Sequence, residues 1–374
     1  MHLSHLHLID FKNCQSASLR FSERINCFIG NNGAGKTNLL DSIHYLSYCK
    51  SYFNPLDQQN IRNGCEMFSL NGTYSNSTDN IQVQCIQRRN QKKSFRFDKK
   101  EIDRLADHIG RIPLVMVSPY DRDLINDGSE LRRRFIDSMI SQFDPLYLDA
   151  LIRYNKALVQ RNALLRSARP NSPDPAMLAL WDEQLIPAGK LIYDRRTSFL
   201  AEYAPVFTKY YTQLSGSAEE AGISYDSALT DKPFEELLKS SLQRDLQYSF
   251  TTRGIHRDDL NLNLNGMPLK KFGSQGQQKS FAIALKLAQF EHTALKKQMK
   301  PILLLDDIFD KLDDKRVQYL IELVSGGLFG QVFITDTQPQ RIMQLFEHGN
   351  IEHRIFYVER GTVIPWEQYA ETHE

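Results

Sequence analysis

The feature that most restricts the fold of this chain is the stretch Gly30-Asn31-Asn32-Gly33-Ala34-Gly35-Lys36-Thr37. It matches the pattern G-x-x-x-x-G-K-[ST] at every fixed position, and that pattern lies between a strand and a helix. Residues 25–29 before it are mostly apolar and predict a buried strand, and residues 38–48 after it have apolar side chains at helical spacing. The sequence therefore predicts a phosphate-binding loop within an α/β fold.

The residue types in this loop suit a nucleotide. Glycines at 30, 33 and 35 permit backbone angles that a Cβ would forbid, so successive N–H groups can turn inward around phosphate oxygens. Lys36 would reach the β- and γ-phosphates, and the Thr37 hydroxyl would hold Mg²⁺. We therefore expect ATP and Mg²⁺ as cofactors, with a glycine-rich turn that binds nothing as the alternative. The expected nucleotide-binding residues are Gly30, Asn31, Asn32, Gly33, Ala34, Gly35, Lys36 and Thr37.

A second acidic element follows far along the chain. Residues 302–307 are four apolar residues that end in Asp306 and Asp307, which predicts a buried parallel strand that delivers two carboxylates to the edge of a sheet. Asp306 would orient Mg²⁺, and Asp307 would position the attacking water. A site built from both ends of the chain implies that the residues between them are an insertion into one ATPase domain.

The segment Phe272-Gly273-Ser274-Gln275-Gly276-Gln277-Gln278-Lys279 precedes a long helical pattern and resembles the signature loop of ABC-type ATPases. Ser274 and Gly276 would stand at a helix N-terminus, which is a second anion site. In that superfamily the loop contacts the nucleotide of a partner subunit, which implies a head-to-tail homodimer on ATP. Asp310-Lys311-Leu312-Asp313 stands in the expected order behind it. The candidate catalytic residues are Lys36, Asp307 and Ser274.

Near the start, residues 3–11, 17–21 and 25–29 predict three strands that form the sheet from which the phosphate loop emerges. Lys12 lies in the turn after the first of them. It is a candidate nucleotide contact, although a solvated turn lysine fits the spacing equally well.

A strongly basic run at residues 88–100 lies at the tip of the antiparallel hairpins predicted from residues 74–86 and 94–97, with Asp98 as its single acid. If it neutralised about five phosphates, log affinity for DNA would fall with log salt at a slope of about −4.5. A solvated hairpin face is the alternative reading. The candidate DNA-binding residues are Arg88, Arg89, Lys92, Lys93, Arg96, Lys99 and Lys100.

Helical patterns on both sides of a proline-rich break at residues 169–175 predict two antiparallel helices in an arm. We expect the ATPase head to comprise residues 1–125 and 247–374, and the inserted helical arm to comprise residues 126–246. The fold class is thus an α/β P-loop head with a mixed sheet plus a helical lobe. Four arginines of the arm could touch DNA or form a solvated face: Arg153, Arg161, Arg166 and Arg169.

Composition sets further limits. A formal charge of +1 means that any affinity for nucleic acid must come from local patches. The five cysteines lack a C-x-x-C pair, which suits free thiols in a reducing cytoplasm, and the sequence gives no indication of membrane spanning or secretion. His2, His5 and His7 form a weak candidate for a metal site. Asp258 and Asp259 could hold a metal or form a hydrogen-bonded turn, and the turn is favoured.

In combination these motifs resemble one branch of the superfamily, the RecF family of bacterial recombination mediators, which is related to the SMC-type chromosome ATPases. The resemblance covers most of the chain. It rests on Asp10-Phe11-Lys12-Asn13, the Gly-Asn-Asn-Gly form of the phosphate loop, Val117-Ser118-Pro119-Tyr120-Asp121, Arg132-Arg133-Arg134-Phe135-Ile136-Asp137, His256-Arg257-Asp258-Asp259, Ser274-Gln275-Gly276-Gln277 and Leu305-Asp306-Asp307.

This resemblance implies a cytoplasmic protein that dimerises on ATP and binds double-stranded and gapped DNA, including single-strand to double-strand junctions. It implies work with the RecO and RecR proteins to help load RecA in recombinational repair, replication restart and SOS induction. Weak DNA-dependent ATP hydrolysis would act as a switch.

The chain departs from the ABC transporter pattern at three places. Asp307 stands where transporters carry a glutamate, which predicts slow hydrolysis. Residues 335–337 replace the switch histidine, and Asp310 replaces a small or hydroxyl residue. The competing hypotheses are the ATPase subunit of a transporter, a defence-system ATPase, and a scaffold whose nucleotide site is structural.

Overall fold

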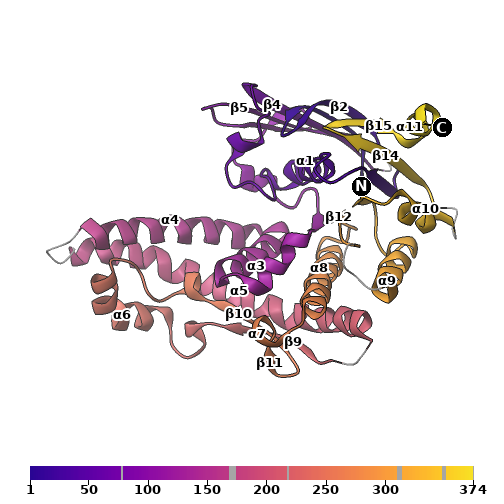
Figure 1. Cartoon of the computed structure of the whole chain (residues 1–374). Coiled ribbons are helices and arrows are strands. Elements are labelled where there is room, and N and C mark those ends of the chain that lie inside the picture. The colour runs from indigo at the N-terminus through magenta and orange to yellow at the C-terminus, as the bar shows by residue number, and fades with distance from the viewer. Residues whose placement is uncertain (77–78, 168–173, 217–218, 310–313, 348–350, 374) are drawn as a thin grey trace. The chain divides into compact units, whose positions relative to one another are not determined.

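The computed structural model describes all of the 374 residues except 77–78, 168–173, 217–218, 310–313, 348–350 and 374 (Figure 1). The chain divides into two compact units. Unit 1 comprises Met1–Asp121 with Gln289–Glu374, and unit 2 comprises Arg122–Ala288. The second unit is thus an insertion in the sequence of the first.

One antiparallel sheet of unit 1 has the strand order β2-β1-β4-β5-β6-β7. In β4 every second residue is buried, as expected for a sheet with one face on a core. The predicted strand 74–86 is wrong in its bounds, because β4 ends at Ser75 and the next strand begins at Asn80. The strands are β1 (His2–Phe11), β2 (Cys14–Arg20), β4 (Met67–Ser75), β5 (Asn80–Arg88), β6 (Ser94–Phe97) and β7 (Lys100–Glu101).

The other sheet of unit 1 has the order β15-β14-β3-β13-β12-β8 and is parallel except for the pair β14 and β15. Every residue of β3, β12 and β13 is buried, which matches their mostly apolar sequences; the polar exceptions are Asn26, Asp306, Thr335 and Asp336. The strands are β3 (Ile25–Ile29), β8 (Leu114–Val117), β12 (Ile302–Asp306), β13 (Val332–Asp336), β14 (His353–Glu359) and β15 (Thr362–Pro365).

The prediction that the first three strands form one sheet is wrong. The strand before the phosphate loop, β3, pairs with β13 and β14, whereas β1 and β2 belong to the antiparallel sheet. Every residue of β3 is buried, which suits a parallel sheet covered on both faces, whereas β1 and β2 bury only some of their residues, as in an antiparallel sheet with one face on a core.

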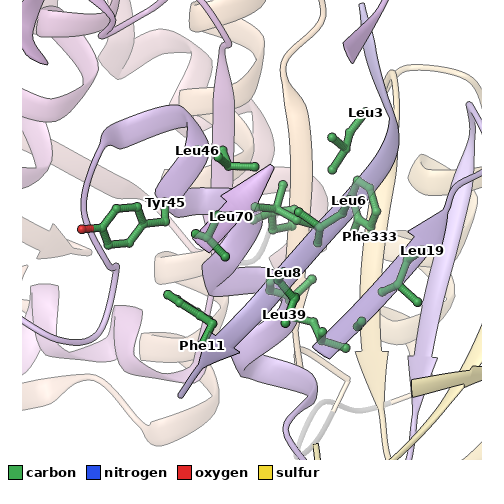
Figure 2. Packing of buried hydrophobic residues seen from close by; sticks show 14 of the residues in the cluster. Leu3, Leu6, Leu8, Phe11, Leu19, Leu39, Tyr45, Leu46, Leu70 and Phe333 are labelled. Atoms are coloured by element: carbon green, nitrogen blue, oxygen red, sulfur yellow. The ribbon is translucent and has the colours of Figure 1, made fainter. Parts of the chain in front are cut away.

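The hydrophobic core of unit 1 contains side chains from both sheets and from α1 (Lys36–Tyr48). Figure 2 shows Leu6 and Leu8 of β1, Leu39 and Leu46 of α1 and Phe333 of β13 in this cluster. Because α1 packs into the core, the helix that follows the phosphate loop is held firmly. The other helices of unit 1 are α9 (Asp314–Ser325), α10 (Pro339–Glu347) and α11 (Trp366–His373).

Unit 2 is largely helical, and α4 (Pro145–Ser167) and α5 (Pro175–Ser215) lie side by side (Figure 1). Arg161 bonds Asp182 while Tyr147 bonds Arg196, so the two helices run antiparallel, as predicted. Most of the predicted break between them lies outside the described residues. The other helices are α2 (Asp123–Asn126), α3 (Ser129–Phe143), α6 (Phe234–Tyr248), α7 (Leu269–Phe272) and α8 (Gln275–Lys297), and α8 crosses the division between the units.

A small sheet of β9 (Ala221–Asp226), β10 (Asp259–Leu264) and β11 (Met267–Pro268) completes unit 2. Asn265 and Gly266 link β10 to β11 with φ of 50° and 74°, the hairpin turn that their sequence predicts. The strand β10 pairs with β9 inside unit 2, and this unit extends to Ala288. The predicted boundary at 246/247 therefore differs from this division, and the assignment of head and arm stays a prediction.

Two buried arginines organise the interior of unit 2. Arg196 Nη2 donates to both carboxylate oxygens of Asp137, at 2.9 and 3.1 Å, and Arg196 Nη1 donates to Asp258 at 3.4 Å. Arg161 pairs with Asp182 and Asp245, both at 2.7 Å. Arg161 is therefore not a DNA contact, because its guanidinium is buried and paired with these two carboxylates. Arg153 and Arg166, in contrast, are exposed. Arg169 lies outside the described residues.

The side-chain partners of Asp258 and Asp259 lie far away in the sequence, which differs from the local hydrogen-bonded turn that the sequence favours. Asp258 accepts from Tyr225, and Asp259 accepts from Arg132 at 2.6 and 2.9 Å, so both carboxylates join distant segments of unit 2. None of the helices in the described ranges combines the length and apolar character needed to cross a membrane.

Candidate nucleotide-binding site

The phosphate loop has the backbone that its glycines predict. Gly33 and Gly35 have φ of 78° and 116°, in the region that favours glycine. A Cβ on Gly30 would lie 2.2 Å from the carbonyl oxygen of Val358 in β14. Glycine is thus required at 30 by close approach of another strand, and at 33 and 35 by conformation.

Two segments from opposite ends of the sequence brace the loop. Asn13, in the turn between β1 and β2, donates to the Ala34 carbonyl at 3.1 Å and accepts from Asn38 at 2.7 Å. The Gly361 N–H donates to the same Ala34 carbonyl at 2.8 Å. These bonds fix the loop before any ligand arrives. The sequence predicts no role for Asn13, although this residue directly follows the candidate Lys12.

Lys36 is buried, and its ammonium donates to the carbonyls of Gly30 at 2.7 Å and Asn31 at 3.0 Å. Burial lowers the pKa of Lys36, and the carboxylates of Asp307, Asp306 and Asp336 oppose that shift. The loop thus holds a partly desolvated cation at its centre, where phosphate oxygens would offer it stronger acceptors than carbonyls.

The first acid of the buried strand meets two hydroxyl groups. Asp306 Oδ1 accepts from Thr37 at 2.8 Å and from Thr335 at 2.9 Å, although Thr37 and Asp306 are 269 positions apart in the sequence. The Asp307 N–H donates to Thr335 at 2.9 Å, and Asp307 has a φ of 47°. Thr335 lies in the stretch 335–337, which is predicted to replace the switch histidine, and the sequence predicts no role for it.

Burial raises the pKa of Asp306, and Asp307 acts in the same direction, while Thr37, Thr335 and Lys36 oppose the rise. A buried carboxylate with hydroxyl neighbours fits a hard cation, because Mg²⁺ prefers oxygen ligands and would neutralise the charge. The same residues line one pocket, formed by Asn32, Gly33, Gly35, Lys36, Thr37, Asn38, Asp306, Asp307 and Thr335.

The structure places Lys12 differently from a free phosphate contact. Its ammonium lies 2.6 Å from a carboxylate oxygen of Asp41, which is fully buried and also accepts from Ser51 and the Tyr52 N–H. Lys12 is not among the pocket residues of the described chain. Through Asp41, Lys12 stabilises the start of the loop that follows α1.

The candidate signature loop begins α8 with a reciprocal cap. Ser274 Oγ accepts from the Gln277 N–H at 3.2 Å, and the Ser274 N–H donates to Gln277 Oε1 at 2.7 Å. Ser274 is exposed and lies in unit 2, whereas the pocket lies in unit 1. Residues 310–313 lie outside the described part of the chain, so Asp310 has no structural account.

The basic run divides into two groups. Lys93 pairs with Asp57 at 2.7 Å and donates to the Cys49 carbonyl, and Arg89 donates to the Cys65 carbonyl. These two cations stabilise unit 1 itself. The side chains that face solvent are Arg88, Lys92, Arg96, Lys99 and Lys100.

The other candidate sites do not assemble. Within the described residues no group of three or more His, Cys, Asp or Glu side chains could hold a metal, and His5 instead contacts Ser18 at 2.9 Å. All five cysteines are free, as expected.

Comparison with known proteins identifies the family. Residues 2–362 match the family described as the RecF/RecN/SMC N terminal domain. The chain is 46% identical over 375 residues to the DNA replication and repair protein RecF of Phocaeicola vulgatus, covering 99% of this chain and 100% of that protein. It is 47% identical over 357 residues to RecF of Flavobacterium johnsoniae, covering 95% of this chain and 99% of that protein.

Solved structures agree. The structure of the recombination mediator protein RecF-ATP in the RecFOR pathway matches with a TM-score of 0.87 and 28% identity, covering 97% of each chain. An Smc head bound to the C-winged helix domain of ScpA matches with a TM-score of 0.57 and 14% identity, covering 99% of this chain and 100% of that one, a likeness of fold alone. The chain therefore belongs to the RecF family of DNA replication and repair proteins.

Proposed function

We propose that this chain is an ATP-dependent DNA-binding dimer of recombinational repair, with weak ATP hydrolysis that acts as a switch. The observation that carries the proposal is the meeting of Thr37 and Asp306 at 2.8 Å beside the buried ammonium of Lys36. Two oxygen donors for a hard cation and one cation for phosphate are the minimum set for Mg²⁺ and ATP.

Each residue has a separate task. The N–H groups of the loop would surround the phosphates, and Lys36 would exchange its carbonyl acceptors for phosphate oxygens. Thr37 and Asp306 would hold Mg²⁺, which supplies charge neutralisation at the phosphates when bound. Asp307 would position the attacking water.

The geometry of Asp307 supports slow hydrolysis. Its side chain is one methylene shorter than glutamate, and its backbone is in the left-handed region with its N–H bonded to Thr335. A short carboxylate on a fixed backbone reaches less far toward a water beside the γ-phosphate. Slow turnover suits a timed clamp better than a motor.

Dimerisation is supported by the capped signature loop. Ser274 and Gly276 stand at the start of α8, where helix N–H groups and the helix dipole favour an anion. In the proposed dimer this anion is the γ-phosphate of ATP bound by the partner subunit, and two such contacts close the two-fold assembly.

The DNA role rests on family membership and on the exposed cations at residues 88–100. We propose that the dimer binds gapped DNA and single-strand to double-strand junctions, and that it acts with RecO and RecR to help load RecA during repair, replication restart and SOS induction. A similar solved protein is a recombination mediator of the RecFOR pathway, which supports this assignment.

Sedimentation with ATP and Mg²⁺, with and without gapped duplex DNA, tests the proposal. We expect the wild type to dimerise with ATP, and Lys36→Met and Ser274→Arg to remain monomeric. Lys36→Met should lose nucleotide binding, whereas Ser274→Arg should keep it and lose only the contact with the partner. A wild type that stays monomeric with ATP and DNA together would refute the dimer.

A further inference from the structure

We propose that Thr335 is a positioning residue that couples the metal ligand Asp306 to the backbone of Asp307. This inference rests on the proposed function, because it concerns the same Mg²⁺ and ATP. It goes beyond that function by assigning a role to the stretch where transporters carry a switch histidine.

The sheet register puts Thr335 in the necessary place. Strands β12 and β13 are parallel neighbours, and Asp306 is the register partner of Thr335. Their side chains therefore stand at the same level on adjacent strands, at the carboxyl edge where the phosphate loop also begins. Thr335 has no exposed surface, and as a β-branched residue in a strand it has few rotamers.

One hydroxyl group makes two contacts that differ in direction. Thr335 Oγ1 donates its proton to Asp306 Oδ1 at 2.9 Å and accepts the N–H of Asp307 at 2.9 Å. The first contact orients the carboxylate proposed to hold Mg²⁺. The second fixes the peptide at which the chain leaves the strand, where Asp307 has a φ of 47°.

Through these two hydrogen bonds, the orientation of the Asp306 carboxylate is coupled to the position of the Asp307 backbone. The carboxylate of Asp306 cannot rotate toward a cation without changing its bond to Thr335, and Thr335 in turn holds the N–H of Asp307. Partners that orient a metal ligand are usually worth about 10- to 100-fold in metal affinity or activity. We therefore expect Thr335 to affect the metal-dependent part of nucleotide binding and the rate of hydrolysis.

Binding of a fluorescent ATP analogue, titrated with Mg²⁺ and repeated in EDTA, tests this role. In Thr335→Val, which keeps the shape and removes the hydroxyl, the Mg²⁺ concentration for half-maximal tightening should rise about 10-fold or more. Binding in EDTA should change less than about twofold, because the phosphate loop is untouched. In single-turnover hydrolysis at saturating Mg²⁺ and ATP the rate should also fall.

Two variants control for folding. Thr335→Ser keeps the hydroxyl and should titrate like the wild type. Thr293→Val removes a hydroxyl that is buried to a similar degree, at 1% exposure in the same unit, and should have no effect on Mg²⁺ dependence. Thermal unfolding of each variant confirms that it is folded before binding is compared.

The outcomes separate the two proposals. If Thr335→Val titrates with Mg²⁺ as the wild type does, or if Thr335→Ser fails equally, the positioning role is refuted while the nucleotide site stands. Equal losses in EDTA and in Mg²⁺ would reduce Thr335 to a structural role. If the wild type itself shows no Mg²⁺-dependent binding, the proposed function fails.

Discussion

Two buried charge clusters, one in each unit, differ in whether the buried charge has partners of opposite charge. In unit 2 the guanidinium of Arg196 is 1% exposed, and two carboxylates, Asp137 and Asp258, surround it. In unit 1 the carboxylate of Asp306 is 3% exposed, and its hydrogen bonds come from two neutral hydroxyls. The first cluster is balanced by protein groups, whereas the second is balanced only in part.

The pKa shifts record the same difference. Although burial acts to lower the pKa of Arg196, Asp137 and its neighbours raise it well above the ordinary value. In the pocket, burial dominates, so the pKa of Asp306 rises and that of Lys36 falls. Removing one partner of a buried charge pair destabilises the fold, whereas a buried charge without a full set of protein partners is a candidate for a ligand site.

The largest expected effect is a loss of stability when the cluster around Arg196 loses its cation. Arg196→Leu leaves Asp137 and Asp258 without their shared cation and should cost about 3–5 kcal/mol in the free energy of unfolding. The adjacent Arg195 pairs with Asp144 at 3.0 Å but is 52% exposed, so Arg195→Leu should cost no more than about 1 kcal/mol. Urea unfolding followed by circular dichroism measures both. Equal losses for the two variants would contradict the comparison.

Neutralising the mismatched cluster should have the opposite result. Because the native pKa of Asp306 lies above its unfolded value of 3.8, native protein binds the proton more tightly, and stability falls as pH rises through that window. Asp306→Asn should therefore be at least as stable as wild type at pH 7 without ligand. It should lose the gain from Mg²⁺ and ATP, which is about 2.7 kcal/mol at ligand 100 times Kd.

Thermal shifts with and without Mg²⁺ and ATP provide the measurement for this variant. A ligand-free Asp306→Asn that melts well below the wild type would show that Asp306 serves the fold and not the site.

Acid should lower the free energy of unfolding of unit 2, because His256 is buried there in its neutral form. His256 bonds Tyr154 at 2.8 Å and the Thr251 carbonyl at 2.9 Å, and burial lowers its pKa from 6.5 to about 4. The unfolded chain takes up a proton below pH 6.5 while the native chain does not, so stability falls between about pH 6.5 and 4. From pH 6.5 to pH 5 the loss should be about 2 kcal/mol.

Urea unfolding of the wild type and His256→Gln at pH 7 and pH 5 isolates this contribution, because other titrating groups are common to both. The variant should lose less stability on acidification. If both lose the same amount, His256 is not the responsible group.

The smallest expected effects concern the basic run at residues 88–100, which contains both paired and exposed cations. Lys93 is matched by Asp57, so Lys93→Gln should cost about 1 kcal/mol of stability. Lys99→Gln and Lys100→Gln should leave stability within about 0.5 kcal/mol. If these exposed residues contact DNA, each should reduce the slope of log affinity against log salt by about 0.9. Binding to labelled duplex at several salt concentrations decides this, and an unchanged slope would move the DNA surface elsewhere.

The sequence was sufficient wherever a short segment carries its own constraint. The phosphate loop, the buried strand that ends in Asp306 and the hairpin turn at Asn265 and Gly266 were all predicted, because glycine conformations, apolar runs and turn residues act locally.

Other features could not be predicted, because they depend on partners far away in the sequence. The charge pattern of α4 did not reveal that Arg161 faces Asp245, which is 84 positions away. Nothing near β3 indicates that it pairs with β13 and β14 and not with β1. The role proposed for Thr335 likewise depends on the pairing of β12 with β13, which the local sequence does not indicate.

The bracing of Ala34 from two distant segments has a consequence for synthesis on the ribosome. The Gly361 N–H that bonds the Ala34 carbonyl, and strand β14 that flanks β3, are made about 300 residues after the loop itself, which at bacterial rates is about 15–60 s later. Until then the nascent loop lacks the bond from Gly361, and for most of that time it also lacks Asp306, the proposed metal ligand, which lies 269 positions beyond Thr37. We expect ATP to be captured only by a chain whose C-terminal strands have docked, so nucleotide binding reports the completion of unit 1.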